Sequence, residues 1–143
     1  MTIARIIAGR SPDDIISCDA TTPVSEAIQM LAGQRIGALP VLRDGLIAGI
    51  ISERDVIYCL AASGRDCLDQ TVGDIMTSPA VTVEPATRID DALALMTRRR
   101  FRHFPVVKDG KLLAFISIGD LVKTKIDEVE HEAEALRNYI QTG

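Results

Sequence analysis

The chain has 143 residues, enough for one ordinary domain or two very small ones, and 47% of them are hydrophobic, enough for a core. A net charge of −4 and a pI near 5.1 disfavour nucleic acid and anionic membranes as partners. No signal-peptide pattern opens the sequence and no apolar run approaches the ~20 residues that cross a bilayer, so a cytoplasmic location is predicted.

The three cysteines, Cys18, Cys59 and Cys67, are widely spaced and form no C-x-x-C pair. Two histidines in the whole chain do not complete a ligand set. We therefore expect buried, unpaired thiols and no bound metal.

The sequence repeats itself after 65 residues. A shift of that length places Pro40-Val41 on Pro105-Val106, Asp44-Gly45 on Asp109-Gly110, Ile51-Ser52 on Ile116-Ser117, and Asp55 on Asp120. Such self-similarity predicts two copies of one structural unit. We place the copies at residues 1–65 and 66–123, followed by an extension over 124–143.

In the first copy, a lead-in segment TIARII (2–7) comes before a short alternating stretch at 16–18, which predicts a strand. Thr22 is a candidate N-cap with Pro23 at the first helical position, and apolar spacing predicts a helix over 23–34. LPVL and LIAGII, joined by RDG, then predict a β-hairpin, because Asp-Gly suits a tight turn. A second helix follows Ser52.

After a short polar linker (61–70), the second copy repeats this order. A lead-in TVGDIM (71–76) comes before VTV (81–83) and a helix over 88–99, with Thr87 and Asp90 as a capping-box-like pair. FPVV and KLLAFI around KDG predict the second hairpin, and another helix follows Ser117. The fold class is therefore α+β, with two β-α-β-β-α units whose sheets pack about a pseudo-twofold axis.

Each hairpin is followed by the pattern Ser-x-x-Asp: Ser52 with Asp55, and Ser117 with Asp120. One interpretation is a plain helix N-cap, worth ~1 kcal/mol. A helix N-terminus also stabilises a phosphate, and a carboxylate one turn later can accept hydrogen bonds from sugar hydroxyls. Both interpretations can hold at once.

The segments IGALPVLRDGLIAGIISERDV and FRHFPVVKDGKLLAFISIGDL together resemble tandem CBS (cystathionine β-synthase) domains, with no attached enzyme or channel. The resemblance covers nearly the whole chain. It implies a Bateman module, in which two clefts between the repeats commonly bind AMP, ADP, ATP, NAD(H) or S-adenosylmethionine. We expect AMP first among these adenosyl nucleotides, and no metal.

The resemblance also implies the residues of those clefts. The aspartates Asp55 and Asp120 would bind ribose, and Ser52 and Ser117 would help to hold phosphate. Adenine would lie between apolar strand residues, with neighbouring positions also in contact with the ligand. These are Ile16, Leu39, Thr82, Val83, Phe104 and Pro105.

Basic residues distinguish the two copies. Arg102 and His103 stand where the first copy has Gly37 and Ala38, and the resemblance places them at the phosphates, with Arg100 as a further candidate. The alternative is a solvated charged face at a helix end. Arg54 falls inside the first Ser-x-x-Asp, where it could clamp a phosphate or pair with its acidic neighbours.

The last segment carries an a/d heptad pattern. Its apolar residues are Val122, Ile126, Val129, Ala133, Leu136 and Ile140. We favour pairing with a second copy as a homodimer, and packing across the chain's own apolar face is the alternative.

No catalytic motif is found, which disfavours an enzyme. The CBS resemblance implies a regulatory module that binds an adenosyl nucleotide and signals to an unidentified protein target. The alternative is a protein–protein adaptor that binds no ligand. Nucleic acid and membrane binding are not expected.

Overall fold

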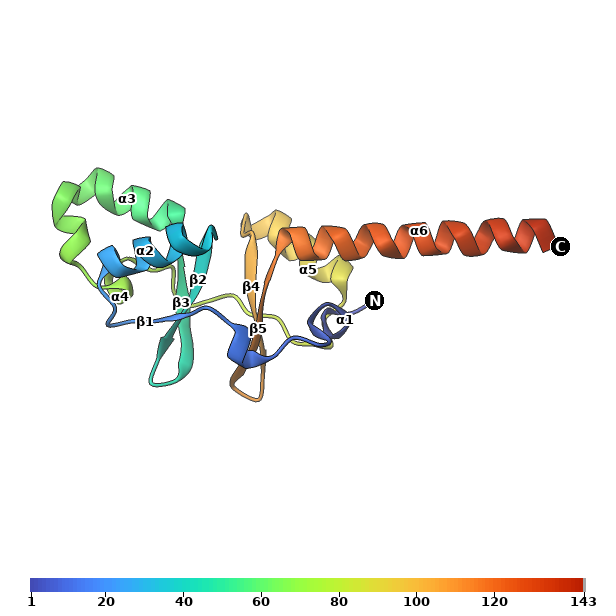
Figure 1. The fold of residues 1–143 in the computed structure, drawn as a ribbon, viewed down its shortest axis with the longest axis horizontal. Coiled ribbons are helices and arrows are strands. Elements are labelled where there is room, and N and C mark those ends of the chain that lie inside the picture. The colour runs from blue at the N-terminus through green and yellow to red at the C-terminus, as the bar shows by residue number, and fades with distance from the viewer. Residues whose placement is uncertain (143) are drawn as a thin grey trace.

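The computed structural model describes residues 1–142 as two repeats side by side, with a long helix projecting from the second (Figure 1). The first half contains α1 (Ile3–Ile7), the 3-10 turn η1 (Pro12–Asp14), β1 (Cys18–Asp19), α2 (Val24–Gln34), β2 (Ala38–Arg43), β3 (Leu46–Ser52) and α3 (Glu53–Ser63). The second contains η2 (Gly64–Asp69), α4 (Val72–Ile75), α5 (Ile89–Arg99), β4 (His103–Lys108), β5 (Lys111–Ser117) and α6 (Ile118–Thr142). This order confirms the predicted α+β class.

Each repeat is built on an antiparallel hairpin. In the first, β2 pairs with β3 and β1 adds two parallel pairs, so the predicted strand at 16–18 lies one to two residues later. In the second, β4 pairs with β5 and the predicted strand at 81–83 is a single bridge from Val83 to Val106. The Asp-Gly pairs have positive φ at both residues, as a tight hairpin turn requires.

The predicted helices at 23–34 and 88–99 each begin one residue later than predicted and end where predicted. The predicted threonine caps are wrong. The N-cap positions belong to Pro23 and Arg88, which make no side-chain cap. Thr22 Oγ1 accepts the N–H of Asp19, and Thr87 Oγ1 accepts that of Glu84. These hydroxyls close the preceding turns, while the two threonine carbonyls accept N–H groups from the lead-in segments.

The lead-in helices are exchanged between the repeats. Ile3 in α1 is fully buried in the second-repeat core with Phe104 and Ile116. Val72 in α4 is fully buried in the first-repeat core with Ile51. Each core therefore needs residues from both copies of the sequence, although the predicted boundary at 65/66 separates the copies along the chain.

The linker between the repeats is ordered. It forms η2, and Cys67 packs there with Cys59 and Val24 in a small apolar cluster. All three cysteines are buried and free, as predicted. Burial raises the pKa of the Cys18 and Cys67 thiols to about 11, so both are protonated at neutral pH.

Helix α6 begins in the body and leaves it. Leu121 is fully buried, and Lys125 pairs with Asp90 of α5 at 2.8 Å. Beyond that ion pair the helix extends past every other element (Figure 1). Within residues 1–142, none of the helices combines the length and the apolar character needed to cross a membrane.

Candidate functional site

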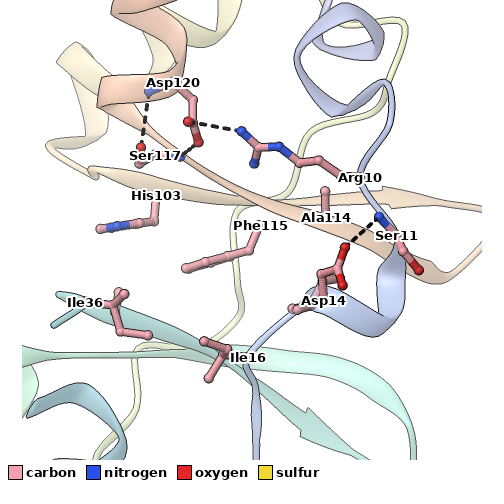
Figure 2. Close-up of a pocket in the computed structure, with 12 residues that line it drawn as sticks. Arg10, Ser11, Asp14, Ile16, Ile36, His103, Ala114, Phe115, Ser117 and Asp120 are labelled. Atoms are coloured by element: carbon pink, nitrogen blue, oxygen red, sulfur yellow. Dashed lines mark hydrogen bonds and ion pairs between the residues drawn. The ribbon is translucent and has the colours of Figure 1, made fainter. Parts of the chain in front are cut away.

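A cavity of about 260 Å³ lies between the hairpins of the two repeats (Figure 2). The N-terminal segment, the first repeat and the second repeat all contribute to its wall. The lining residues are Arg10, Ser11, Asp14, Ile15, Ile16, Ile36, Ala38, His103, Ala114, Phe115, Ser117 and Asp120. We call this cavity the second-repeat cleft, since its carboxylate is that of Asp120.

The start of α6 positions Asp120. Its Oδ2 accepts the N–H of Ser117 at 2.9 Å, and the Asp120 N–H donates to Ser117 Oγ at 3.2 Å. This reciprocal pair is the predicted capping box. It fixes one carboxylate oxygen toward the backbone and leaves Oδ1 for another partner.

That partner is Arg10. Its guanidinium Nη2 lies 3.1 Å from Asp120 Oδ1 and reaches in from the N-terminal segment (Figure 2). Burial alone would raise the pKa of Asp120, but the Ser117 N–H and the Arg10 guanidinium outweigh it and hold that pKa below its usual range. The carboxylate is therefore ionised at neutral pH.

The rest of the cleft provides a flat, mainly apolar wall. His103 and Phe115 are stacked, with ring centroids 5.3 Å apart and planes 8° from parallel. Ile16 and Ile36 lie across from them (Figure 2). Burial lowers the pKa of His103, helped by Arg102 and opposed by Asp120 and Glu53. The planar ring of a ligand in this cleft would therefore have apolar side chains on two sides and the neutral imidazole of His103 beside it.

In the first repeat, the equivalent carboxylate is engaged differently. Asp55 Oδ2 accepts the Ser52 N–H at 2.9 Å and the Ser52 hydroxyl at 3.0 Å. Ser52 Oγ in turn accepts the Asp55 N–H at 3.3 Å, which confirms the predicted cap. Its Oδ1 accepts the Thr77 hydroxyl at 3.0 Å. Asp55 borders a separate, more open hollow of about 330 Å³ along α3, which is also lined by Tyr58, Cys59, Ala62, Ser63, Gln70 and Ile75.

Thr77 reaches Asp55 because its segment lies directly on β3. The Thr77 and Ile50 backbones exchange two hydrogen bonds, of 3.0 and 2.9 Å. Gly49 permits this approach, since a Cβ there would lie 2.6 Å from the Thr77 carbonyl oxygen. The matching residue in the second repeat is Ala114, which is buried in the second-repeat core and borders the cleft.

The structure divides the predicted site residues into four groups. Ile16, His103, Ser117 and Asp120 line the second-repeat cleft. Ser52 and Asp55 form the first-repeat cap. The expectation that adenine lies between the side chains of Leu39, Val83 and Phe104 is not supported, because these side chains are buried in the cores. Pro105, the remaining candidate, is buried opposite Phe115 and does not line the cavity. Arg54, Thr82, Arg100 and Arg102 are exposed and line neither cavity.

The sequence reasoning missed Arg10, Ile36 and Phe115. Phe115 pairs with Pro105 and lies on the opposite face of the hairpin from Phe104, whose partner is Ile116; the cleft is lined by the Phe115 face. The signal for Arg10 is a length difference: eight residues (8–15) follow the first lead-in, and four (77–80) follow the second. Within residues 1–142, potential metal-binding side chains do not gather in groups of three or more.

Comparison with known proteins agrees with this architecture. The CBS domain family matches residues 11–62 and 72–127. The mitochondrial CBS domain-containing protein CBSX3 of Arabidopsis thaliana is 38% identical over 141 residues, covering 94% of this chain and 68% of its own. Sequence and family pattern therefore coincide over both repeats.

Solved structures give the same result. The CBS-domain protein ATU1752 of Agrobacterium tumefaciens superposes with a TM-score of 0.81 at 32% identity, covering 87% of this chain and 99% of its own. CBSX2 in complex with AMP has a TM-score of 0.75 at 26% identity, covering 88% of this chain and 96% of its own. The chain belongs to the CBS-domain family, as a domain pair of the non-catalytic, regulatory kind.

Proposed function

We propose that the second-repeat cleft binds an adenosyl nucleotide, AMP in the first place, and that its occupancy is signalled to a partner protein. The observation that carries the proposal is the position of Asp120, whose carboxylate faces a cavity with a stacked His103–Phe115 wall. Adenine suits the apolar wall, and the ribose hydroxyls suit the carboxylate. The AMP complex of CBSX2 supports this choice of ligand.

The size of the cleft favours a mononucleotide. Its volume of about 260 Å³ is slightly below the ~300–1,000 Å³ that is typical of small-molecule sites. A nucleoside can lie inside while its phosphate stands at the mouth, near Ser117 and the first turn of α6. Gly119 leaves that turn without a side chain. ADP, ATP and NAD(H) would extend further into solvent.

A thermal-shift screen against AMP, ADP, ATP, NAD and NADH tests this function. A ligand that binds only the folded chain raises its melting temperature. We expect AMP to give the largest rise, and Asp120→Ala to abolish it while Asp55→Ala leaves it largely in place. If no adenylate shifts the wild-type protein at millimolar concentration, the ligand-free adaptor would be the better interpretation.

We also propose that α6 pairs with its copy in a homodimer. The seam residues Val122, Ile126, Val129, Leu136 and Ile140 are 42–69% exposed on the single chain. Since the distal half of α6 projects away from the body, the chain's own apolar face does not cover it (Figure 1). A second α6 offers a matching stripe at the same spacing. The cytoplasmic location remains a prediction from the sequence.

Light scattering after size-exclusion chromatography tests the dimer. Replacing Leu136 and Ile140 with Asp should convert the dimer into a monomer, because two charges would be buried in the seam. Replacing the outward-facing Glu134 with Gln should change nothing. A wild-type monomer at all concentrations would contradict the dimer proposal without affecting nucleotide binding.

A further inference from the structure

Arg10 occupies the point at which a ligand would meet Asp120. Its side chain is 39% exposed, and that of Asp120 is 30% exposed. The backbone behind it is held on both sides: the Arg10 N–H donates to the Ile7 carbonyl, and Ser11 forms a capping box with Asp14 at η1. The guanidinium therefore extends from an anchored turn into the mouth of the cleft (Figure 2).

We propose that Arg10 is a latch that discriminates phosphorylated from unphosphorylated ligands, a role that rests on the proposed nucleotide function. In the empty cleft it holds the Asp120 carboxylate. When a nucleotide enters, the ribose hydroxyls take over the carboxylate and the guanidinium turns to the phosphate. A nucleoside breaks the same ion pair and supplies no replacement for it.

The bonds of Asp120 favour this exchange. Its Oδ2 is held by the Ser117 N–H, so Oδ1 is the oxygen that can turn toward an incoming hydroxyl. Arg10 Nη2 lies on that oxygen at 3.1 Å. A ribose diol competes directly with the guanidinium, and the guanidinium then needs another anion, for which the planar fork of arginine suits phosphate.

Arg10 is the cation in the cleft that can contact a phosphate. Among the lining residues it is the one arginine or lysine, and Asp14 and Asp120 are acidic. Arg102 and Arg100, for which the family resemblance implied phosphate contact, do not line the cavity. His103 does line it, but burial lowers the pKa of the imidazole and keeps it neutral. The cation that meets the phosphate therefore comes from the N-terminal segment.

The first repeat provides an internal contrast. There the residue on the Asp55 Oδ1 is Thr77, a neutral hydroxyl that cannot neutralise a phosphate. Thr77 lies in the shorter connection after α4, and Arg10 lies in the longer connection after α1. The discriminating cation is therefore a property of one cleft and not of the repeated unit.

Calorimetric titration with adenosine and with AMP tests the assignment. In the wild-type protein AMP should bind more tightly. Arg10→Ala should weaken AMP by roughly tenfold, the value of a lost charge-assisted bond, and leave adenosine unchanged or a few-fold tighter. Arg10→Lys should give an intermediate AMP/adenosine ratio, because a point charge replaces the fork. Arg65→Ala, an exposed arginine on η2, is the control with the same charge change and should retain the wild-type ratio.

Two results would overturn the assignment, and they are distinguishable. If Arg10→Ala binds adenosine and AMP with the wild-type ratio, Arg10 does not discriminate phosphate although the cleft binds nucleotides. If the wild-type protein binds neither ligand, the proposed function itself fails. Circular dichroism of each variant checks that the fold is intact, which we expect because Arg10 is on the surface.

Discussion

The two repeats carry the same Ser-x-x-Asp pattern and form the same cap, yet only Asp120 faces the cavity between the two hairpins. Asp120 faces a cavity together with Phe115 and His103. Asp55 is bonded to Thr77, which lies in the segment after α4 that pairs with β3. The repeated motif thus fixes where the carboxylate lies, and the segment packed beside it determines which residue bonds its second oxygen and which cavity it faces.

Two small differences in sequence produce this contrast. Gly49 lets the chain at Thr77 lie flat on β3, where Ala114 has a methyl group in the second repeat. The connection after the first lead-in is also longer, and it forms η1 at the edge of the cleft, whereas the connection after the second lead-in forms the bridge from Thr77 to Ile50. Each difference can be changed separately.

The largest expected effect tests whether the repeats depend on each other. Ile3→Ala should destabilise the protein by about 2–5 kcal/mol, because the fully buried side chain leaves a cavity in the second-repeat core. Chemical denaturation measures the loss, with Ile57→Ala on α3, where the side chain is 61% exposed, as control. Hydrogen exchange should rise in β4 and β5. A rise confined to β2 and β3 would contradict the exchange of lead-in helices.

Gly49→Ala tests how the segment at Thr77 is held against β3. The new Cβ would lie 2.6 Å from the Thr77 carbonyl oxygen and 2.8 Å from Met76 Sδ. The segment at Met76 and Thr77 must therefore move, which should reduce the free energy of unfolding by about 1–3 kcal/mol. Gly33→Ala is the matched control, since nothing lies within 4 Å of its Cβ. Equal stability of the two variants would show that the segment at Thr77 can pack on β3 without a glycine at position 49.

Thr77→Val removes the hydroxyl from Asp55 and keeps the shape of the side chain. The loss of one partly exposed hydrogen bond should reduce the free energy of unfolding by about 0.5–1 kcal/mol. Denaturant titration measures it. An unchanged denaturation midpoint would mean that water replaces the hydroxyl at no cost in stability, and that backbone pairing alone holds the segment at Thr77 on β3.

The smallest expected effect concerns the pH dependence of the open cleft. The pKa of His103 is lower in the folded chain than its ordinary value near 6.5, so the unfolded chain takes up the proton first as pH falls. This contribution to stability is present above about pH 6.5 and is lost progressively below it. His103→Gln should flatten the melting temperature between pH 7 and 5.5. An identical slope in the variant would contradict the assignment.

Most of the fold could be predicted from the sequence. Period, turn residues and the 65-residue repeat gave the hairpins and the helices within one or two residues. The exchange of lead-in helices could not be predicted, because Ile3 and Val72 are apolar in equivalent segments and nothing local tells which core receives them. The threonine caps failed for a related reason, since their carbonyls serve the exchanged helices.

The candidate site was predicted less completely. Asp120 and Ser117 followed from a local pattern, but the walls of the cleft depend on which side of each strand faces the other repeat. Phe104 points into the core and Phe115 into the cleft, and this orientation depends on how the two hairpins pack against each other. Arg10 lies 110 positions before Asp120, and only the packed structure brings them to 3.1 Å.

A crystal structure of the protein grown with AMP tests the central claim most directly. We predict one nucleotide per chain, with its base beside Phe115 and Ile36 and its ribose hydroxyls on Asp120, and with Arg10 turned from the carboxylate to the phosphate. Nucleotide bound at Asp55 while the second-repeat cleft holds none would contradict the account.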